Sequence, residues 1–189
     1  MAAEPRYISP EEYLARERKA ATKSEYLDGR IVAMAGASEN HSLLQSTVNA
    51  LLFFQLRRRG CQIHGSDLRV KVPARRSYMY PDLTIICGNS QFDEDRRDNL
   101  LNPTVIIEIL SPSTALYDRT EKFARYRQIP TLREYLLIAQ DTPKIEHFVR
   151  QTDDQWLWSL AEQLTDTITL PSINCTLALA DIYADIVFA

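Results

Sequence analysis

Two carboxylates in the middle of the chain, Asp82 and Glu108, could together bind a metal ion and support metal-assisted chemistry. Glu108 interrupts residues 104–110, TVIIEIL, an otherwise largely aliphatic run that predicts a strand covered on both faces. Burying an ionised carboxylate is costly unless a cation or hydrogen-bond donors compensate it, so some group must meet Glu108. Asp82 lies at the start of an earlier predicted strand, residues 80–87. If the two strands are neighbours, both carboxylates converge at one end of a sheet.

Such a pair of carboxylates suits a magnesium or manganese ion. Magnesium typically takes one or two protein carboxylates and keeps several waters and substrate oxygens. The backbone carbonyl of Ile109 would add another hard oxygen ligand. A metal held in this way neutralises charge on a phosphate under attack and lowers the pKa of a bound water. The pattern therefore predicts metal-assisted hydrolysis of phosphodiester bonds.

A predicted helix, from residue 117 or 118 to residue 127, would bring a cation to the same place. Asp118, Lys122 and Tyr126 follow one another at intervals of four residues, which places them on one helix face. Lys122 would then stand beside the carboxylates, where it could orient the attacking water or shield charge in the transition state. The sequence shows no competing cysteine–histidine pair, phosphate-cradling glycine loop or Gly-x-Ser-x-Gly elbow.

Structural roles are open for the same residues. Asp82 follows a proline and could simply bond a nearby backbone N–H at the start of its strand. Glu108 and Lys122 could form a structural ion pair, since perturbed charge pairs also occur outside active sites. The catalytic and the structural interpretation of these three residues both stand at this point.

Further residues join the predicted site with weaker support. His41 lies in the first turn of a predicted helix over residues 41–59, where a lone histidine is more often a cap or a surface residue than a ligand. We keep it as a second-tier site residue, together with Asp118 and Tyr126. Three basic residues could guide phosphate: Arg75, Arg76 and Arg125.

Composition limits the classes of protein that fit. The 189 residues fit one domain, 1–189, and the net charge of −3 argues against a protein that coats DNA. The sequence shows neither a run long enough to span a bilayer nor a secretory pattern at its start. Cys61, Cys87 and Cys175 are odd in number and far apart, which argues against a disulfide framework or a zinc site. We therefore expect a cytoplasmic protein without a membrane partner.

The elements that must position the site follow from hydrophobic periodicity and turn residues. Helices are predicted at 10–19, 41–59, 117–127 and around 177–183. Hairpins are predicted at 23–35, turning at Asp28–Gly29, and at 61–72, turning at Gly65–Ser66. Further strands are predicted at 80–87, 104–110, 132–139, 144–151, 156–160 and 167–170, with a solvated loop at 88–102. Mixed helices and strands predict an α/β fold with a central mixed sheet flanked by helices.

A family resemblance is carried by the residues of the predicted site. Pro81-Asp82, then Glu108-x-Leu110-Ser111-Pro112-Ser113, then Asp118-x-x-x-Lys122-x-x-x-Tyr126, resembles the Uma family of bacterial proteins. The hairpin sequence EYLDG at 25–29, the His41 helix start and the segment REYL at 133–136 are also similar to it. That family is placed in the PD-(D/E)XK nuclease superfamily, and the resemblance covers roughly residues 9–183.

The resemblance implies a restriction-endonuclease-like core at about residues 38–140. This core would hold a helix, a three-stranded antiparallel meander, a helix and a further strand, with the N-terminal helix and hairpin and the C-terminal strands added to it. Asp82 and Glu108 match the metal-binding acids of the superfamily. The superfamily's lysine, two residues after the second acid, is Leu110 here, and Lys122 on the following helix matches the position that this family uses instead.

Two functions are consistent with these patterns. The first is a Mg²⁺- or Mn²⁺-dependent endonuclease acting on nucleic acid, with DNA the favoured substrate. The alternative is a catalytically weak or inactive nuclease-fold protein that serves as a binding or assembly module. Its exposed hairpins and two tryptophans could support a homodimer.

Overall fold

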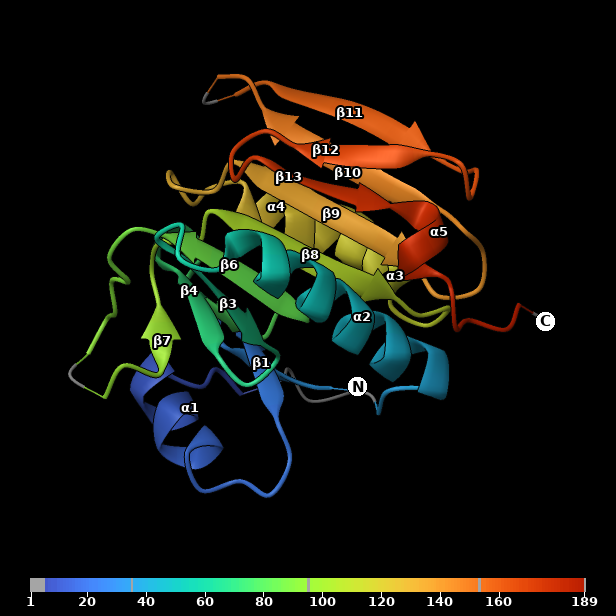
Figure 1. The fold of residues 1–189 in the computed structure, drawn as a ribbon. Helices are drawn as coiled ribbons and strands as arrows, with labels where there is room; N and C mark the ends of the chain where they lie inside the picture. The colour runs from blue at the N-terminus through green and yellow to red at the C-terminus, as the bar shows by residue number, and fades with distance from the viewer. Residues whose placement is uncertain (1–5, 35, 95, 153, 189) are drawn as a thin grey trace.

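A six-stranded mixed sheet runs through the centre of the molecule (Figure 1). The structure is a computed structural model that describes residues 6–34, 36–94, 96–152 and 154–188. The strand order is β11-β10-β9-β8-β6-β3, and only β8 and β9 are parallel. The strands are β3 (Cys61–Gly65), β6 (Leu83–Cys87), β8 (Val105–Leu110), β9 (Glu134–Ala139), β10 (Ile145–Arg150) and β11 (Trp156–Ala161). The predicted α/β fold with a central mixed sheet is confirmed.

A five-stranded sheet holds the N-terminal hairpin, in the order β2-β1-β5-β4-β7. Its strands are β1 (Ser24–Leu27), β2 (Arg30–Ala33), β4 (Arg69–Val72), β5 (Ser77–Met79) and β7 (Asn99–Leu100). The predicted turn between β1 and β2 is confirmed, since Asp28 and Gly29 both have positive φ, 47° and 95°. Aspartate and glycine tolerate this conformation better than most residues, which is why the chain reverses here.

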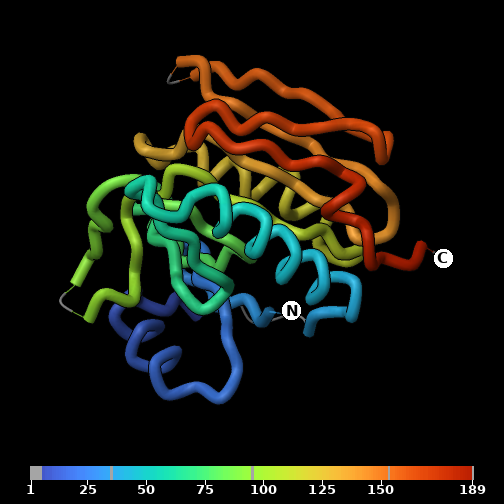
Figure 2. Tube along the Cα trace, in the orientation of Figure 1, coloured from blue at the N-terminus to red at the C-terminus, as the bar shows by residue number. Residues whose placement is uncertain are grey.

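Helices cover both faces of the central sheet (Figure 2). The helical segments of the chain are α1 (Pro10–Glu17), α2 (Glu39–Leu56), α3 (Ala115–Tyr117), the π-helical turn η2 (Asp118–Lys122), α4 (Phe123–Tyr126) and α5 (Leu179–Ile182), with a 3₁₀ turn η1 (Pro73–Arg75). Helix α1 packs on the five-stranded sheet and not on the central one. Segments α3, η2 and α4 follow one another without a break and form the predicted helix after the Glu108 strand. Within the described part of the chain, none of the helices has the length and hydropathy needed to cross a membrane.

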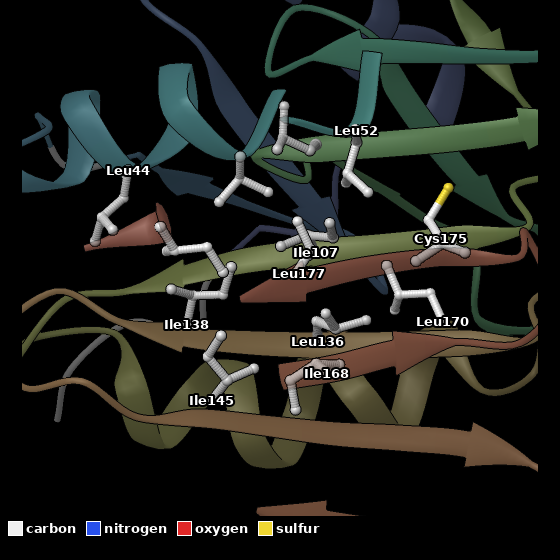
Figure 3. Close-up of a cluster of buried hydrophobic side chains, with 14 of the residues drawn as sticks. Leu44, Leu52, Ile107, Leu136, Ile138, Ile145, Ile168, Leu170, Cys175 and Leu177 are labelled. Atoms are coloured by element: carbon white, nitrogen blue, oxygen red, sulfur yellow. The ribbon is translucent and has the colours of Figure 1, made fainter. Parts of the chain in front are cut away.

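The core is built in two layers, one on each face of the central sheet. On one face, α2, α5 and the hairpin of β12 (Thr167–Leu170) and β13 (Cys175–Ala178) bury aliphatic side chains against β6, β8 and β9 (Figure 3). On the other face, the five-stranded sheet and the α3–η2–α4 segment pack against the same strands. Both alternate sets of β8 side chains are therefore buried, as the aliphatic run predicted. Val105, Ile107 and Ile109 belong to the first layer, so Glu108 points into the second.

Several predicted elements are placed differently by the structure. The predicted hairpin at 61–72 is wrong, because β3 pairs with β6 in the central sheet whereas β4 pairs with β5 and β7 in the other. The strand predicted to open at Tyr80 begins at Leu83, and the preceding strand, β5, ends at Met79. Strand β7 lies in the predicted loop, and β13 occupies part of the helix predicted around 177–183.

The prediction on cysteine pairing is also wrong. Cys61 on β3 and Cys87 on β6 lie directly opposite each other and form a disulfide with a Cα–Cα distance of 4.0 Å. Neighbouring antiparallel strands bring together residues that are distant in sequence, and spacing alone did not indicate this pair. Cys175 is free and buried. The expectation of a reducing cytoplasm, which rested on unpaired cysteines, loses that support.

Candidate active site

Strands β6 and β8 bring Asp82 and Glu108 together, as the sequence predicted for neighbouring strands. Leu83 pairs with Ile107, so Asp82, one residue earlier, lies beside Glu108. The Asp82 N–H donates to Glu108 Oε2 at 3.4 Å, and the Ile109 N–H donates to Asp82 Oδ2 at 2.7 Å. The second oxygen of the Asp82 carboxylate, Oδ1, has no hydrogen-bond partner among the described residues. The two carboxylates thus share one end of the central sheet.

Lys122 supplies the cation that Glu108 requires. It lies on η2, over the sheet face to which Glu108 points, and its Nζ is 3.2 Å from Glu108 Oε1 and 3.1 Å from Asp118 Oδ1. The side chains of Lys122, Glu108 and Asp118 are 10%, 3% and 3% exposed. Lys122 therefore reaches the carboxylates from the predicted helix face, and the contact is almost completely buried from solvent.

Tyr126 and Asp118 complete the contacts of this helical segment. Tyr126 is fully buried, and its hydroxyl donates to Glu108 Oε1 at 3.2 Å. The backbone carbonyl of Asp118 accepts a hydrogen bond from the Tyr135 hydroxyl at 3.0 Å, which ties η2 to β9. Glu108 Oε1 thus has two partners on one helical segment, and its position is set by both.

Glu25 belongs to the same cluster, and the sequence analysis did not place it there. Its carboxylate accepts the Tyr80 N–H at 3.1 Å and the Tyr117 hydroxyl at 3.2 Å, and lies 3.6 Å from Lys122 Nζ. Glu25 is 3% exposed although it stands on a strand of the N-terminal hairpin. The sequence did contain a sign of this role, because Glu25 is followed by Tyr26 and Leu27. When neighbouring side chains on both faces of a strand are buried, a carboxylate between them has no solvent-exposed face and needs a partner.

His41 reaches the site from the opposite side of the sheet. Ser38 caps α2 by accepting the His41 N–H, and His41 Nε2 lies 3.2 Å from Asp82 Oδ2. One turn later, Gln45 donates its side-chain N–H to the Asp82 backbone carbonyl at 2.8 Å. The His41 Nδ1 is buried and has no partner among the described residues. The first turns of α2 therefore hold both the side chain and the backbone of Asp82.

The cluster carries more negative than positive charge. Four carboxylates, on Glu25, Asp82, Glu108 and Asp118, surround Lys122 and His41. Burial raises the pKa of Glu108 well above its ordinary value, the neighbouring carboxylates raise it further, and Lys122 opposes them. Burial alone would lower the pKa of Lys122, but Glu108, Glu25 and Asp118 outweigh it and the pKa lies well above the usual value. Added positive charge would stabilise this cluster.

A cleft of about 760 Å³ opens onto these residues. Its walls come from the β1–β2 hairpin, the start of α2 and the loop 111–114. Lys23 lines the rim and pairs with Asp67 at 2.9 Å. The three arginines predicted to guide phosphate are not part of the described lining, and Arg125 binds Asp28 at 2.7 Å. Within the described residues, the lysines of the cleft are thus already paired with carboxylates.

The donor set fits a hard divalent cation. Among the described residues no group of three or more His, Cys, Asp or Glu side chains is arranged around one metal position. Asp82 and Glu108 both line the cleft, with Ile109 beside them. Two carboxylates and a backbone carbonyl, with water and substrate oxygens, are the ligands that Mg²⁺ accepts. The excess of negative charge is consistent with such an ion.

Comparison with known families covers nearly the whole chain. Residues 10–180 match the Uma2 family model, described as "Putative restriction endonuclease". The chain belongs to the Uma2 family. The family resemblance inferred from the sequence is therefore confirmed.

Two relatives and one solved structure are also similar to this chain. Two uncharacterized proteins of Synechocystis sp. are 39% identical over 155 residues and 36% identical over 183 residues. The first match covers 82% of this chain and 88% of the relative, and the second covers 96% and 94%. A crystal structure of "a putative nuclease" from Anabaena variabilis superposes with a TM-score of 0.79 at 19% identity, covering 95% of this chain and 99% of the other. The structural match shows that the two proteins share a fold.

Proposed function

We propose that this Uma2 protein is a Mg²⁺- or Mn²⁺-dependent endonuclease that hydrolyses phosphodiester bonds in nucleic acid, with DNA as the favoured substrate. The observation that carries the proposal is the convergence of Asp82, Glu108 and Lys122 in one cleft at the end of the central sheet. The family description and the nuclease-like fold support a nuclease-like function. An enzyme acting on cellular DNA would work in the cytoplasm.

The residues nearest the proposed metal position have separate proposed roles. Asp82 and Glu108, with the Ile109 carbonyl, would hold the metal, which when bound supplies Lewis-acid stabilisation of the phosphate and an acidified water. Lys122 holds its charge beside Glu108, where it can orient a water or shield developing negative charge. His41 keeps the Asp82 carboxylate in place, and Asp118 does the same for Lys122.

Substrate binding in this cleft would depend on the divalent ion. The described lysines of the cleft are engaged by carboxylates, so they offer little free charge to a phosphate. A metal between the two acids would supply the missing positive charge. Arg75, Arg76 and Arg125 lie outside the described lining, and we restrict their proposed role to phosphates of nucleic acid that extends beyond the cleft.

Cleavage assays on single-stranded, duplex and structured DNA and RNA test the proposal. Glu108→Gln should reduce Mg²⁺- or Mn²⁺-dependent cleavage by roughly 10²–10³-fold, the range seen when one charge-stabilising group is removed. Glu121→Gln is the matched control, because Glu121 is an exposed acid on the same helical segment, with its side chain 64% exposed. Unchanged cleavage by Glu108→Gln would overturn the assignment.

A binding or assembly module is the alternative that the Lys122 contacts favour, because they already give Glu108 a counter-charge. Thermal unfolding in increasing Mg²⁺ or Mn²⁺ separates the two. An ion at about a hundred times its dissociation constant stabilises the folded state by about 2.7 kcal/mol. The endonuclease proposal expects this stabilisation in the wild type and its loss in Asp82→Asn. A binding or assembly module should show neither a metal-dependent rise in unfolding temperature nor cleavage.

A further inference from the structure

The residues proposed to hold the metal lie at the bottom of the cleft and not on an open surface. The side chains of Asp82 and Glu108 are 13% and 3% exposed, and that of Lys122 is 10% exposed. Oxygen ligands of Mg²⁺, from the protein and from the substrate alike, lie at roughly 2 Å from the ion. A scissile phosphate must therefore enter the cleft until its oxygen shares an ion with side chains that are nearly buried.

The size of the cleft limits what can reach this depth. Its walls include Val32 and Met34 from the β1–β2 hairpin and the residues after it, His41 from the start of α2, and Pro112 from the loop 111–114. The space that they enclose is about 760 Å³. Pockets of roughly 300–1,000 Å³ enclose a ligand the size of a drug molecule. The cleft therefore has room for a short stretch of one strand and not for a section of double helix.

The stiffness of duplex DNA makes it a poor fit to such a cleft. Its persistence length is roughly 50 nm, so a duplex behaves as a straight rod over the width of this protein. Bringing one of its phosphates to Glu108 would press the neighbouring sugars and bases against the walls. An unpaired strand bends at each nucleotide, so it can place one phosphate at the bottom while the next ones stay in solvent. A duplex can do the same only after its base pairs open, a cost that an unpaired strand does not carry.

The charge of the described lining also disfavours a duplex. The lining includes two lysines, both paired with carboxylates, and the four acids Glu25, Asp82, Glu108 and Asp118. Duplex DNA carries one negative charge per roughly 1.7 Å of its axis, and proteins that bind it specifically meet it with a strongly positive surface. A bound divalent ion offsets the charge of the phosphate that it contacts. A row of further phosphates would be repelled by this cleft.

Apolar side chains in the walls offer contacts to unpaired bases. Val32 is 39% exposed, Pro112 is exposed and Met34 is partly exposed, and all three line the cleft. Enzymes that act on nucleotides taken out of the base stack hold the bases between aromatic or apolar side chains. In a duplex the faces of the bases are covered by their neighbours, whereas an unpaired strand exposes them to such walls.

We propose that the cleft binds an unpaired DNA strand, with one phosphodiester group at the metal position and the adjoining bases against Val32, Met34 and Pro112. The inference rests on the proposed function, because it takes the ion between Asp82 and Glu108 as the point that the phosphate must reach. In a substrate that is partly duplex, the paired regions remain outside the cleft.

Fluorescence anisotropy with labelled DNA measures this preference in Ca²⁺, an ion that takes oxygen ligands as Mg²⁺ does. Three DNAs of one sequence are compared: a single strand, a full duplex, and a duplex interrupted by a short unpaired stretch. The single strand and the interrupted duplex should bind roughly a hundredfold more tightly than the full duplex, because only the full duplex must open base pairs. Equal or tighter binding of the full duplex, or no binding of any of the three, would overturn the inference.

A charged substitution in the wall tests whether the strand lies where we place it. Val32→Asp puts a negative charge on an exposed wall residue and should weaken binding of the single strand by roughly five- to tenfold. Leu157→Asp is the matched control, since Leu157 is 58% exposed on β11 and lies outside the described lining. Equal weakening by both variants, or none by Val32→Asp, would overturn the inference.

Cleavage of the same three DNAs in Mg²⁺ or Mn²⁺ separates this inference from the proposed function. The single strand and the unpaired stretch should be cut, and the full duplex should be cut far more slowly. A full duplex that is cut as readily as the single strand would defeat the inference and leave the proposed function intact. A single strand that binds with the expected preference but is not cut would defeat the proposed function and leave the strand preference standing.

Discussion

Replacing Lys122 by methionine should destabilise the metal-free protein through charge and not through packing. Methionine keeps an unbranched side chain of similar length but removes the ammonium group that contacts Glu108, Asp118 and Glu25 at 3.2, 3.1 and 3.6 Å. The variant leaves three carboxylates, each with a side chain no more than 4% exposed, without that cation. Uncompensated buried charge of this kind is among the most costly local changes in a protein.

The expected loss follows from the burial of the pair. Removing one partner of a buried ion pair costs about 3–5 kcal/mol, and we expect the lower end, about 3 kcal/mol, because Glu108 can take up a proton in response. For a chain of this size, about 3 kcal/mol corresponds to a fall in Tm of roughly 6–12 °C. Urea unfolding and thermal unfolding in the presence of a chelator measure both quantities.

The loss should grow as the pH rises. The pKa of Glu108 is raised in the folded state, first by burial and then by the surrounding carboxylates. A carboxyl group of this kind binds more protons folded than unfolded, so its contribution to stability is greatest below its ordinary pKa of 4.5 and is lost as the pH rises through the raised value. Without Lys122 the raised pKa moves higher still. The destabilisation should therefore be larger at about pH 8 than at about pH 5.

A surface lysine provides the control for this experiment. Lys144 pairs with Glu162 at 3.2 Å, with side chains 34% and 52% exposed. Lys144→Met should cost less than about 1 kcal/mol and show little dependence on pH, since exposed pairs contribute little. An equal loss for Lys122→Met at both pH values would show that packing, and not charge, is responsible. No loss at either pH would refute the role of Lys122 as counter-charge.

Three further predictions concern stability. Tyr126→Phe should cost about 1–2 kcal/mol in urea unfolding, because Glu108 loses a buried hydrogen-bond donor at 3.2 Å. Reduction of the Cys61–Cys87 disulfide should lower stability by about 3.5 kcal/mol, as the chain-entropy model predicts for a sequence separation of 26, measured as a fall in Tm with a reducing agent. Burial lowers the pKa of His64, so stability should fall as the pH drops below the ordinary value of 6.5, and His64→Gln should reduce that dependence in acid titrations followed by circular dichroism.

The central part of the fold was predictable because its signals are local. The aliphatic run around Glu108 indicated a strand buried on both faces, and β8 is such a strand. The regular spacing of Asp118, Lys122 and Tyr126 placed their side chains on one helix face, and Lys122 and Tyr126 both contact Glu108. Periodicity and spacing act over a few residues, so they are readable without a structure.

The pairing of strands was predictable only in part, because partners are chosen over long distances. Gly65 and Ser66 indicated a turn, and the chain does bend there, but β3 and β4 leave that turn for different sheets. The Cys61–Cys87 disulfide was not predicted for the same reason, since it forms only because β3 pairs with the distant strand β6. Glu25 was missed for this reason too, since its contact with Lys122 joins the N-terminal hairpin to a helical segment about a hundred residues later.

The position of the lysine has a structural explanation. Leu110, two residues after Glu108, lies on the same face of β8 as Glu108 and is buried in the second core layer at 4% exposure. The helical segment that covers this face carries Lys122 on a π-helical turn, and it brings Nζ to 3.2 Å from Glu108. Such turns are rare and are found frequently at functional sites. The site needs one cation beside Glu108, and a helix packed over the strand supplies it as directly as the strand itself, which leaves Leu110 free to fill the core.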